Sequence, residues 1–503
     1  MSHVQIMQKR ICEKAIESSD SVSEALFEES ELSSCSNPSS SIEDDAQPQN
    51  SLSEALKSIT ESFSEKHVSS FANKLYGELL QAFTTNSDRT LIKTKAPIPT
   101  TNEKGRFLVI DLGGSTFKVF VVDLLGDCKA AIVSGKVWNI ENDKKTIDRG
   151  FFRLMCDHIQ ELLNTGTYFD ITRKIPTAIS WSFPVVQTRP NNGCISDVTK
   201  GYTLAEDIKG QDLGIIFSKM MMVNNNVQLE VDSIVNDAVS VYLAGLYVHK
   251  CHLGLVLGTG LNASFPIKSH LYNSELSFFG TSFLPSLTHN LIDETMCPDV
   301  AFIAPDNYIS SKSPVYQPLE YMCAGRYLGE MFRLGLVIGA LNREIFQDQI
   351  TQFNRNEILV TPYGLSSKII SELSEADYSI ACGIFKIKFG LILTSNDYTM
   401  INSLVEVLTN RAAIILSASI LACMKFISKL SSKKDVNLRE QCRLVYVGSL
   451  LHHYKKYLTK VQSILDRYHI DVGLQKFDMK HMDDSSIIGA AVSAATFVTM
   501  EHM

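Results

Sequence analysis

The chain has 503 residues, of which 45% are hydrophobic and 20% are charged. This composition supports one or two large cores and excludes a disordered or fibrous polymer. The 47 basic and 55 acidic residues give a formal net charge of −8, so the chain lacks the basic excess with which nucleic-acid-binding proteins neutralise phosphates. We expect a two-domain globular protein that binds no nucleic acid.

The cysteines indicate a reducing compartment. Eleven of them are scattered along the chain without a C-x-x-C pair, which is typical of buried thiols. The N-terminus lacks a signal-peptide pattern, and the most apolar stretch, residues 412–424, is shorter than the roughly 20 residues that span a bilayer. We predict a cytoplasmic protein without a membrane span and leave a nuclear pool open.

The first hundred residues divide into a tail and a helical segment. Residues 18–49 are rich in Ser, Glu and Asp and carry few apolar side chains to offset the entropy of ordering. We predict a disordered tail over residues 1–50. Apolar residues then recur at helical spacing from Leu52 to Phe83, which predicts one or two helices. We assign residues 51–104 to a helical segment that packs on the larger domain.

The rest of the chain alternates between β-branched runs and helical patterns. Strands are predicted at residues 106–112, 117–122, 130–138, 177–183, 227–231, 253–257, 262–267 and 443–447. Helices are predicted at residues 151–163, 213–222, 321–341, 401–426 and 450–468, and after Asp237. The order favours two α/β domains around a cleft. The smaller would span residues 105–234, completed by 485–503, and the larger residues 235–484.

Two glycine turns between strands are candidates for phosphate binding. The first follows the carboxylate that ends a strand, and comprises Asp111, Gly113, Gly114, Ser115, Thr116 and Lys118. The second comprises Gly258, Thr259 and Gly260. Glycines let backbone amides approach an anion closely, although such hairpins also occur for structural reasons alone. The P-loop and protein-kinase motifs are absent from the sequence.

Between and beyond these turns lies an ordered series of further motifs. They are Ser182-Phe183-Pro184 with Gln187 and Gly193, Thr199-Lys200-Gly201, Asn236-Asp237, Asn262, Glu275, Glu320, Arg411, Gly448-Ser449 and the C-terminal segment 483–491. From about Leu108 to Val498 the chain resembles the eukaryotic hexokinase family. That resemblance implies an α/β fold of two actin-like (ribonuclease H-like) domains and an ATP-dependent sugar kinase that uses Mg²⁺.

The resemblance also implies roles for individual residues. Asp237 would accept the proton of the sugar hydroxyl, and Lys200 would neutralise charge on the transferred phosphoryl group. The implied sugar-binding residues are Ser182, Phe183, Thr199, Lys200, Asn236, Asp237, Asn262, Glu275 and Glu320. Asp111 would hold water on Mg²⁺, and the two turns with Gly448 and Ser449 would bind ATP. Read alone, Asn236-Asp237 could be only a helix N-cap, and His452 and His453 are expected at the surface rather than as ligands.

Several positions depart from the family pattern. Ser115-Thr116 and Lys118 stand for Thr-Asn and Arg, and Leu276-Ser277 follow Glu275 in place of Trp-Gly. Near the C-terminus, Ser485-Ser486-Ile487 stand for Gly-Ser-Gly. We predict phosphorylation of the 6-hydroxyl of a hexose, with N-acetylglucosamine favoured because the segments around Ser182 and Asn236 look most like the divergent fungal N-acetylglucosamine kinases. The alternatives are a glucose, mannose or fructose hexokinase and a catalytically weak regulatory homologue.

Overall fold

The computed structural model of this chain describes residues 51–87, 89–141, 144–198, 202–296, 317–430 and 441–502. It divides into two compact units. The sheet unit comprises residues 64–285, 298–325 and 410–503, and the helical unit comprises residues 1–63, 286–297 and 326–409. Both predicted α/β blocks fall within the sheet unit, and their division into two domains stays a prediction. The predicted tail, residues 1–50, lies outside the described residues.

A five-stranded sheet with the order β10-β6-β2-β3-β4 forms one half of the sheet unit. Its strands are β2 (Lys104–Leu112), β3 (Thr116–Gly126), β4 (Lys129–Asn139), β6 (Ile175–Trp181) and β10 (Leu229–Val235). All five were predicted, but the predicted range of β10 began and ended too early. The register of β10 against β6 shifts at Asp232, and this bulge interrupts the alternation on which the prediction rested.

A six-stranded sheet with the order β1-β13-β12-β11-β14-β15 forms the other half. Its strands are β1 (Ile92–Lys93), β11 (Leu253–Leu257), β12 (Leu261–Ile267), β13 (His270–Asn273), β14 (Cys442–Val447) and β15 (Phe477–His481). The prediction of a single late strand was wrong, because β15 pairs with β14 in parallel. As an edge strand, β15 is only partly buried and has no clear alternation of apolar residues.

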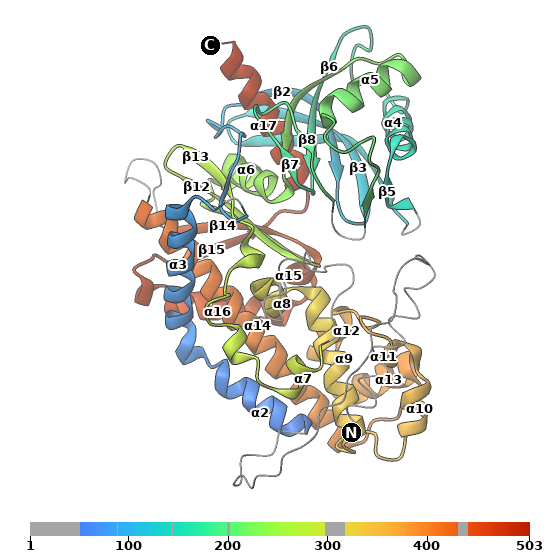
Figure 1. Ribbon diagram of the computed structural model, residues 1–503, viewed down its shortest axis with the longest axis vertical. Helices are drawn as coiled ribbons and strands as arrows, with labels where there is room; N and C mark the ends of the chain where they lie inside the picture. Colours follow the sequence, from blue (N-terminus) through green and yellow to red (C-terminus); the bar gives the residue numbers. More distant parts are fainter. Residues whose placement is uncertain are drawn as a thin grey trace, which may run out of the picture. The chain divides into compact units, whose positions relative to one another are not determined.

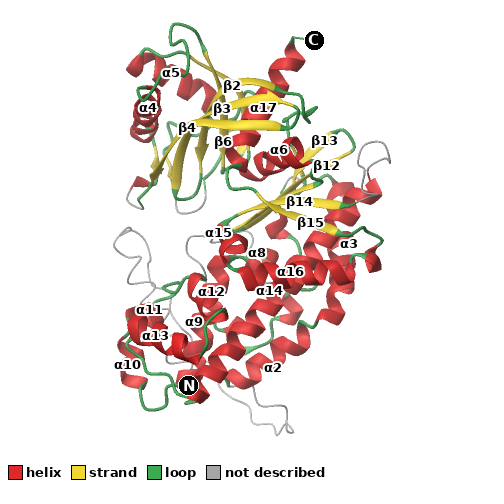
Figure 2. Cartoon of the chain, turned by 180° about the vertical axis from the view of Figure 1, so that it is seen from behind, coloured by secondary structure: helices red, strands yellow, loops and turns green. Residues whose placement is uncertain are grey.

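Two helices, α6 (Asp237–His249) and α17 (Ser485–Glu501), lie between these sheets. Helix α17 packs on β2, β6 and β10, and α6 packs on β11, β12 and β14 (Figure 1). The two helices also pack on each other so closely that a Cβ at Gly489 would lie 1.8 Å from the carbonyl oxygen of Ser240. Figure 2 shows the same packing from behind. Glycine at this crossing is therefore a requirement of helix packing.

The opposite face of the five-stranded sheet is covered by α4 (Arg149–Leu163) and α5 (Leu213–Asn225). Phe152 of α4 and Phe217 of α5 pack against Trp181 and the apolar residues of β2 in one cluster. Successive residues of a strand face opposite sides of a sheet, so β2 contributes to this cluster and to the one around α17. The alternation explains why this strand is apolar along its length.

Several shorter elements complete the sheet unit. The helices are α3 (Val68–Thr85), α8 (Pro318–Cys323), α15 (Ser449–His453) and α16 (Lys455–Tyr468), and the short strands are β5 (Thr146–Ile147), β7 (Val185–Val186), β8 (Cys194–Ile195) and β9 (Thr203–Leu204). The single helix predicted over residues 321–341 is interrupted at Ala324, because the amide of Gly325 donates to the carbonyl of Gly258. The helix predicted over residues 450–468 is likewise interrupted at Tyr454.

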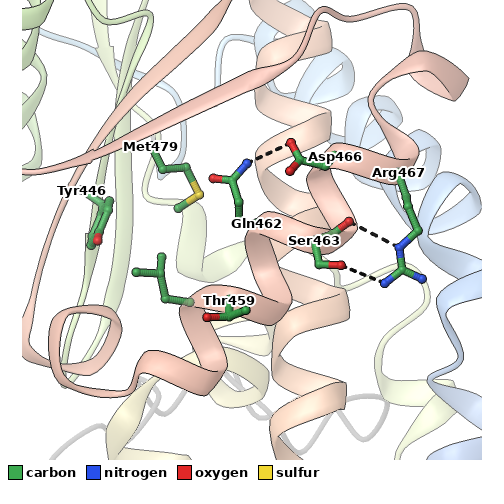
Figure 3. A pocket seen from close by; sticks show the side chains of 8 residues that line it. Tyr446, Thr459, Gln462, Ser463, Asp466, Arg467 and Met479 are labelled. Atoms are coloured by element: carbon green, nitrogen blue, oxygen red, sulfur yellow. Dashed lines mark hydrogen bonds between the residues drawn. The ribbon is translucent and has the colours of Figure 1, made fainter.

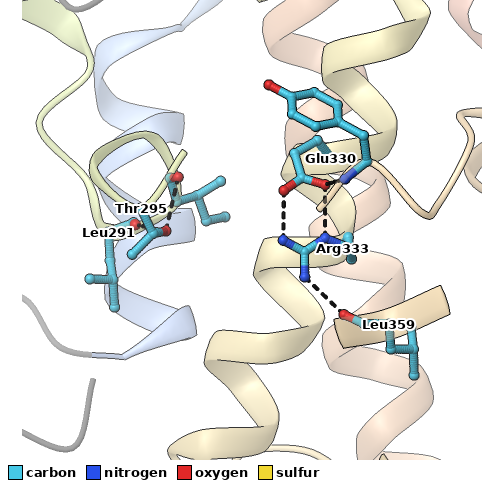
Figure 4. A network of polar contacts seen from close by, with 7 residues as sticks. Leu291, Thr295, Glu330, Arg333 and Leu359 are labelled. Atoms are coloured by element: carbon cyan, nitrogen blue, oxygen red, sulfur yellow. Dashed lines mark hydrogen bonds and ion pairs between the residues drawn. The ribbon is translucent and has the colours of Figure 1, made fainter. Parts of the chain in front are cut away.

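The helical unit is built from α2 (Leu52–Ser62), α7 (Leu291–Glu294), α9 (Gly325–Leu341, from Arg326), α10 (Ile350–Arg355), α11 (Glu357–Val360), α12 (Lys368–Ser374), α13 (Tyr378–Phe389) and the first part of α14 (Ser395–Leu430). Its core holds a fully buried ion pair between Arg333 and Glu330, at 2.6 Å (Figure 4). Arg333 also donates to the carbonyl of Leu359, and Glu330 accepts from the amide of Tyr363. These partners satisfy both buried charges.

Helix α14 is long and apolar enough to cross a membrane, unlike the shorter apolar run counted in the sequence. However, 78% of its most apolar window is buried inside the chain, which is typical of a core helix. Burial against other elements is therefore sufficient to explain its composition.

Candidate functional site

The predicted catalytic carboxylate, Asp237, begins helix α6. The side chain of Asn236 caps this helix by accepting a hydrogen bond from the amide of Ala238 at 3.0 Å. The hydroxyl of Ser182 donates to Oδ2 of Asp237 at 2.9 Å, and the Ala238 amide also donates to Oδ1 at 2.8 Å. The N-cap reading of Asn236 is thus confirmed, and it fixes the adjacent carboxylate at the end of the helix.

Ser182 connects this carboxylate to the first glycine turn. It directly follows β6, and its amide donates to the carbonyl of Leu112 at the end of β2, at 3.2 Å. Farther along the same loop, the side-chain amide of Gln187 donates to the carbonyl of Ile234 at 2.9 Å. Phe183 is only 3% exposed and packs edge-on against Trp181. The loop is therefore held at both ends by contacts with the strands beside Asp237.

The first glycine turn carries a carboxylate with two defined partners. Asp111 and Lys118 are opposite each other in the β2–β3 register, and the Lys118 ammonium lies 3.3 Å from Oδ2 of Asp111. The hydroxyl of Ser486 donates to the same oxygen at 3.1 Å. The amide of Gly113 donates to the carbonyl of Thr116 and closes the turn. Ser486 was noted in the sequence only as part of a segment that departs from the family pattern, and nothing there predicted its contact with Asp111.

Tyr202 adds a contact that the sequence did not predict. Its hydroxyl donates to the carbonyl of Gly113 at 3.3 Å. Burial raises the pKa of Tyr202 to about 12, so the hydroxyl remains a donor at neutral pH. Thr199, Lys200 and Gly201 precede it and lie outside the described residues, so their predicted roles stay predictions. The contact of Tyr202 holds that residue at the first glycine turn.

A cluster of amides and a carboxylate lies at the start of β12 and the end of β13. The side-chain amide of Asn262 donates to Asn273, and that of Asn273 donates to Glu275 at 2.7 Å. Oδ1 of Asn262 accepts from the amides of Ala263 and Leu276. Asn262 and Glu275 were predicted and are brought together, whereas Asn273 was missed. The alternation of β13 is the signal that could have placed Asn273 opposite β12, but four residues are too few to establish it.

The second glycine turn contacts Glu320, which was predicted to bind sugar. Its Oε2 accepts from the amide of Leu261 at 2.8 Å, and a Cβ at Gly260 would lie 2.6 Å from the same oxygen. A Cβ at Gly258 would lie 3.8 Å from the Cα of Gly448 and from the amide nitrogen of Ser449. Thr259 and Ser449 are exposed beside them. The structure therefore brings together all predicted residues of this turn with Gly448 and Ser449.

The residues after Glu275 are both buried. Leu276 and Ser277 are each 2% exposed, and the hydroxyl of Ser277 accepts from the side-chain amide of Gln317 at 3.2 Å. They support the amide cluster from behind rather than presenting side chains to solvent.

A separate pocket of about 570 Å³ lies between α16 and the strands β14 and β15 (Figure 3). It is lined by Tyr446, Leu458, Thr459, Gln462, Ser463, Asp466, Arg467 and Met479. None of the predicted site residues lines this pocket.

Comparison with known proteins identifies the family. Two models described as hexokinase match residues 46–247 and 252–496. N-acetylglucosamine kinase 1 of Candida albicans is 31% identical over 474 residues, which is 88% of this chain and 93% of that protein. Hexokinase-1 of Spinacia oleracea is 26% identical over 81% of this chain and 82% of that protein.

A solved structure agrees in fold. The hexokinase of Schistosoma mansoni, solved in complex with glucose, has a TM-score of 0.71 at 20% identity and covers 88% of this chain and 98% of that chain. A second hexokinase structure has a TM-score of 0.67. The predicted actin-like α/β fold is confirmed. The chain belongs to the hexokinase family of ATP-dependent sugar kinases, as its motifs predicted.

Proposed function

We propose that this chain transfers the γ-phosphoryl group of ATP to the 6-hydroxyl of a hexose, with Asp237 as the general base. The hydrogen bond from Ser182 to Oδ2 of Asp237 is the observation that supports this most directly. A sugar hydroxyl is a weak nucleophile, and an ionised carboxylate can take its proton as the phosphoryl group arrives. The Ser182 hydroxyl and the Ala238 amide orient this carboxylate, so it need not reorganise during the reaction.

The amide cluster gives the sugar hydroxyls a preorganised set of partners. Asn262, Asn273 and Glu275 hold one another by side-chain hydrogen bonds. Amide groups donate and accept while a carboxylate accepts only, so the set can orient several hydroxyls at once. We assign Asn262 and Glu275 to sugar binding, with Ser182, Phe183, Thr199, Asn236 and Glu320 as the further predicted residues of that site. Asn273 positions the first two.

The phosphates would contact the two glycine turns and Gly448-Ser449. Carboxylate oxygens suit Mg²⁺, and both partners of Asp111 use the same oxygen, Oδ2. The fit supports Asp111 as the residue that orients water on the Mg²⁺ of MgATP, which would offset the negative charge of the phosphates. Lys118 keeps Asp111 in place, and the predicted role of Lys200 is to stabilise charge on the transferred group.

The proposed sugar is N-acetylglucosamine. The chain is 31% identical to a Candida albicans N-acetylglucosamine kinase over 88% of its length. Its identity to the spinach hexokinase is 26%, over 81% of its length. Leu276 and Ser277, which stand in place of Trp-Gly, border the amide cluster. We propose that Leu276, which is smaller than Trp, leaves room for a 2-acetamido group.

The base is tested by replacing Asp237 with Asn, which preserves shape but cannot accept the proton. We expect kcat to fall about 100-fold or more while sugar binding, measured by calorimetry, persists. Asp207→Asn is the matched control, because Asp207 is an exposed carboxylate paired with Arg149. Turnover of Asp237→Asn within tenfold of the parent would remove Asp237 from this role.

Specificity is tested by coupled ATP-consumption assays with N-acetylglucosamine, glucosamine, glucose, mannose and fructose. N-acetylglucosamine should have the highest kcat/KM, since its acetamide adds contacts that glucose lacks. A higher kcat/KM for glucose than for N-acetylglucosamine would favour the alternative of a glucose, mannose or fructose hexokinase. Absence of turnover with every sugar would favour the regulatory homologue.

We also infer a cytoplasmic setting. The described cysteines are free, and burial raises the pKa of Cys156 to about 12 and that of Cys251 to about 12, so these thiols stay protonated. Free thiols of this kind persist in a reducing compartment.

A further inference from the structure

Three potential metal ligands converge near the helix that follows Gly448. His452 lies in α15, His481 ends β15, and Asp483 lies in the segment that leads to α17. One ligand atom from each lies within 4.8 Å of the other two. Two segments distant in the sequence, one with His452 and one with His481 and Asp483, therefore bring donors to one point.

The geometry of this cluster suits a tetrahedral cation. Nε2 of His481 lies 3.3 Å from Oδ1 of Asp483. Ligand distances of about 2.0–2.2 Å at tetrahedral angles separate two zinc ligands by about 3.3 Å. The rings of His452 and His481 stack at a centroid distance of 4.0 Å with an interplanar angle of 24°, so the exposed His452 ring has to rotate before a nitrogen of each ring points toward the same ion.

The surroundings keep the cluster accessible. His452 and Asp483 are exposed, and His481 is partly exposed. Lys480 precedes His481 but points to the other face of the strand, where its ammonium lies 3.1 Å from Asp478. Tyr446, the register partner of His481, packs its ring 5.2 Å from the imidazole and limits rotation of that ring.

We propose that His452, His481 and Asp483 form a binding site for Zn²⁺, with water as the remaining ligand. Two imidazoles and one carboxylate suit zinc and disfavour Mg²⁺ and Ca²⁺, which prefer oxygen ligands. The expectation that His452 is a surface side chain agrees with its exposure, whereas the ligand role proposed here departs from the expectation that it is not a ligand.

The site also bears on the nucleotide. His452 is three residues beyond Ser449 in the same short helix, and its amide donates to the carbonyl of Gly448 at 3.3 Å. A bound Zn²⁺ would join α15 to β15 and hold the Gly448-Ser449 corner in one position. This consequence depends on the proposed role of Gly448 and Ser449 in ATP binding, whereas metal binding itself does not.

Isothermal titration calorimetry of the full chain with Zn²⁺, without nucleotide or sugar, tests the site. We expect one binding event in the micromolar range that weakens at least tenfold in His452→Ala/His481→Ala and also in Asp483→Asn. His270→Ala, which removes an exposed imidazole on β13, is the matched control and should bind as the parent does. Circular dichroism and melting temperature establish that each variant is folded.

No binding by the parent below about 100 μM, or unchanged binding by both folded variants, would overturn the site. Loss of binding in only one of the two variants would overturn the three-ligand assignment. A second measurement addresses the nucleotide: micromolar Zn²⁺ should change the KM for ATP of the parent severalfold and leave that of His452→Ala/His481→Ala unchanged. If Zn²⁺ changes the KM for ATP equally in the parent and in His452→Ala/His481→Ala, the effect on the nucleotide does not come from this site. The calorimetric test of zinc binding would stand independently of that result.

Discussion

Both glycine turns join two strands, but the physical reasons for their glycines differ. At the first turn, the nearest atom to a Cβ on Gly113 would be the Thr116 hydroxyl, at an ordinary 3.6 Å. At the second, a Cβ on Gly260 would lie 2.6 Å from Glu320, and the neighbouring Gly448 approaches the Leu257 carbonyl. Gly113 thus tolerates a methyl group in the fold, whereas packing against Glu320 and the Leu257 carbonyl constrains Gly260 and Gly448 in addition to any contact with a ligand. A motif match cannot distinguish these two cases.

The largest expected effect comes from Gly448→Ala. Gly448 has a φ of 120°, and a Cβ there would lie 2.1 Å from the carbonyl oxygen of Leu257. The clash is with backbone and cannot be relieved by a side-chain rotation. We expect the free energy of unfolding to fall by about 3 kcal/mol, measured by chemical denaturation. A loss of unfolding free energy below about 1 kcal/mol would show that the backbone contact of Gly448 with Leu257 constrains the second turn less than this distance indicates.

Gly260→Ala should affect activity more than stability. The methyl group would displace the flexible end of Glu320 and break its hydrogen bond to the amide of Leu261. We expect kcat/KM to fall about 10- to 100-fold, since small misplacements at a reacting site are costly. Glu320→Gln should share part of this loss, and the two changes should be less than additive in the double variant. Full additivity would indicate that the two residues act independently.

The free energy of unfolding should also depend on pH through a carboxyl group of the five-stranded sheet, which carries the first turn. Asp232 lies at the bulge of β10 in the five-stranded sheet, where burial and the nearby Glu230 raise its pKa to about 7. The folded state therefore retains a proton that the unfolded state loses near pH 4. The contribution of the Asp232 carboxyl group to the free energy of unfolding is therefore largest below about pH 4 and declines as the pH rises toward 7. Asp232→Asn should gain about 2–3 kcal/mol on the parent between pH 5 and pH 8. A constant difference across that range would contradict the shift.

The smallest effect is expected at Gly113→Ala. We expect the free energy of unfolding to change by less than about 1 kcal/mol and the KM for ATP to rise severalfold, because the methyl group fits the fold but stands where a phosphate would approach. Calorimetric unfolding and steady-state kinetics on one preparation separate these effects. A change in stability without a change in KM would reverse the roles of the two turns.

Local patterns predicted the strands and the paired residues, and non-local contacts account for the rest. A tight hairpin necessarily places Asp111 opposite Lys118, and a helix following a strand places Asn236 as its N-cap. By contrast, the helix break at Ala324 depends on the hydrogen bond from the amide of Gly325 to the carbonyl of Gly258, and these two residues are 67 positions apart. The contact of Ser486 with Asp111 likewise joins the two ends of the sheet unit. No local pattern contains such information.

The position of α17 has a consequence for synthesis of the protein. The strands of the five-stranded sheet end at Val235, yet the helix that covers one face of that sheet begins at Ser485. On the ribosome, about 250 residues must therefore be added after the last strand before this helix is available. Until then, the apolar face that includes Val109 and Ala178 is not covered by α17. A nascent chain at this stage is expected to bind chaperones that recognise exposed apolar surface.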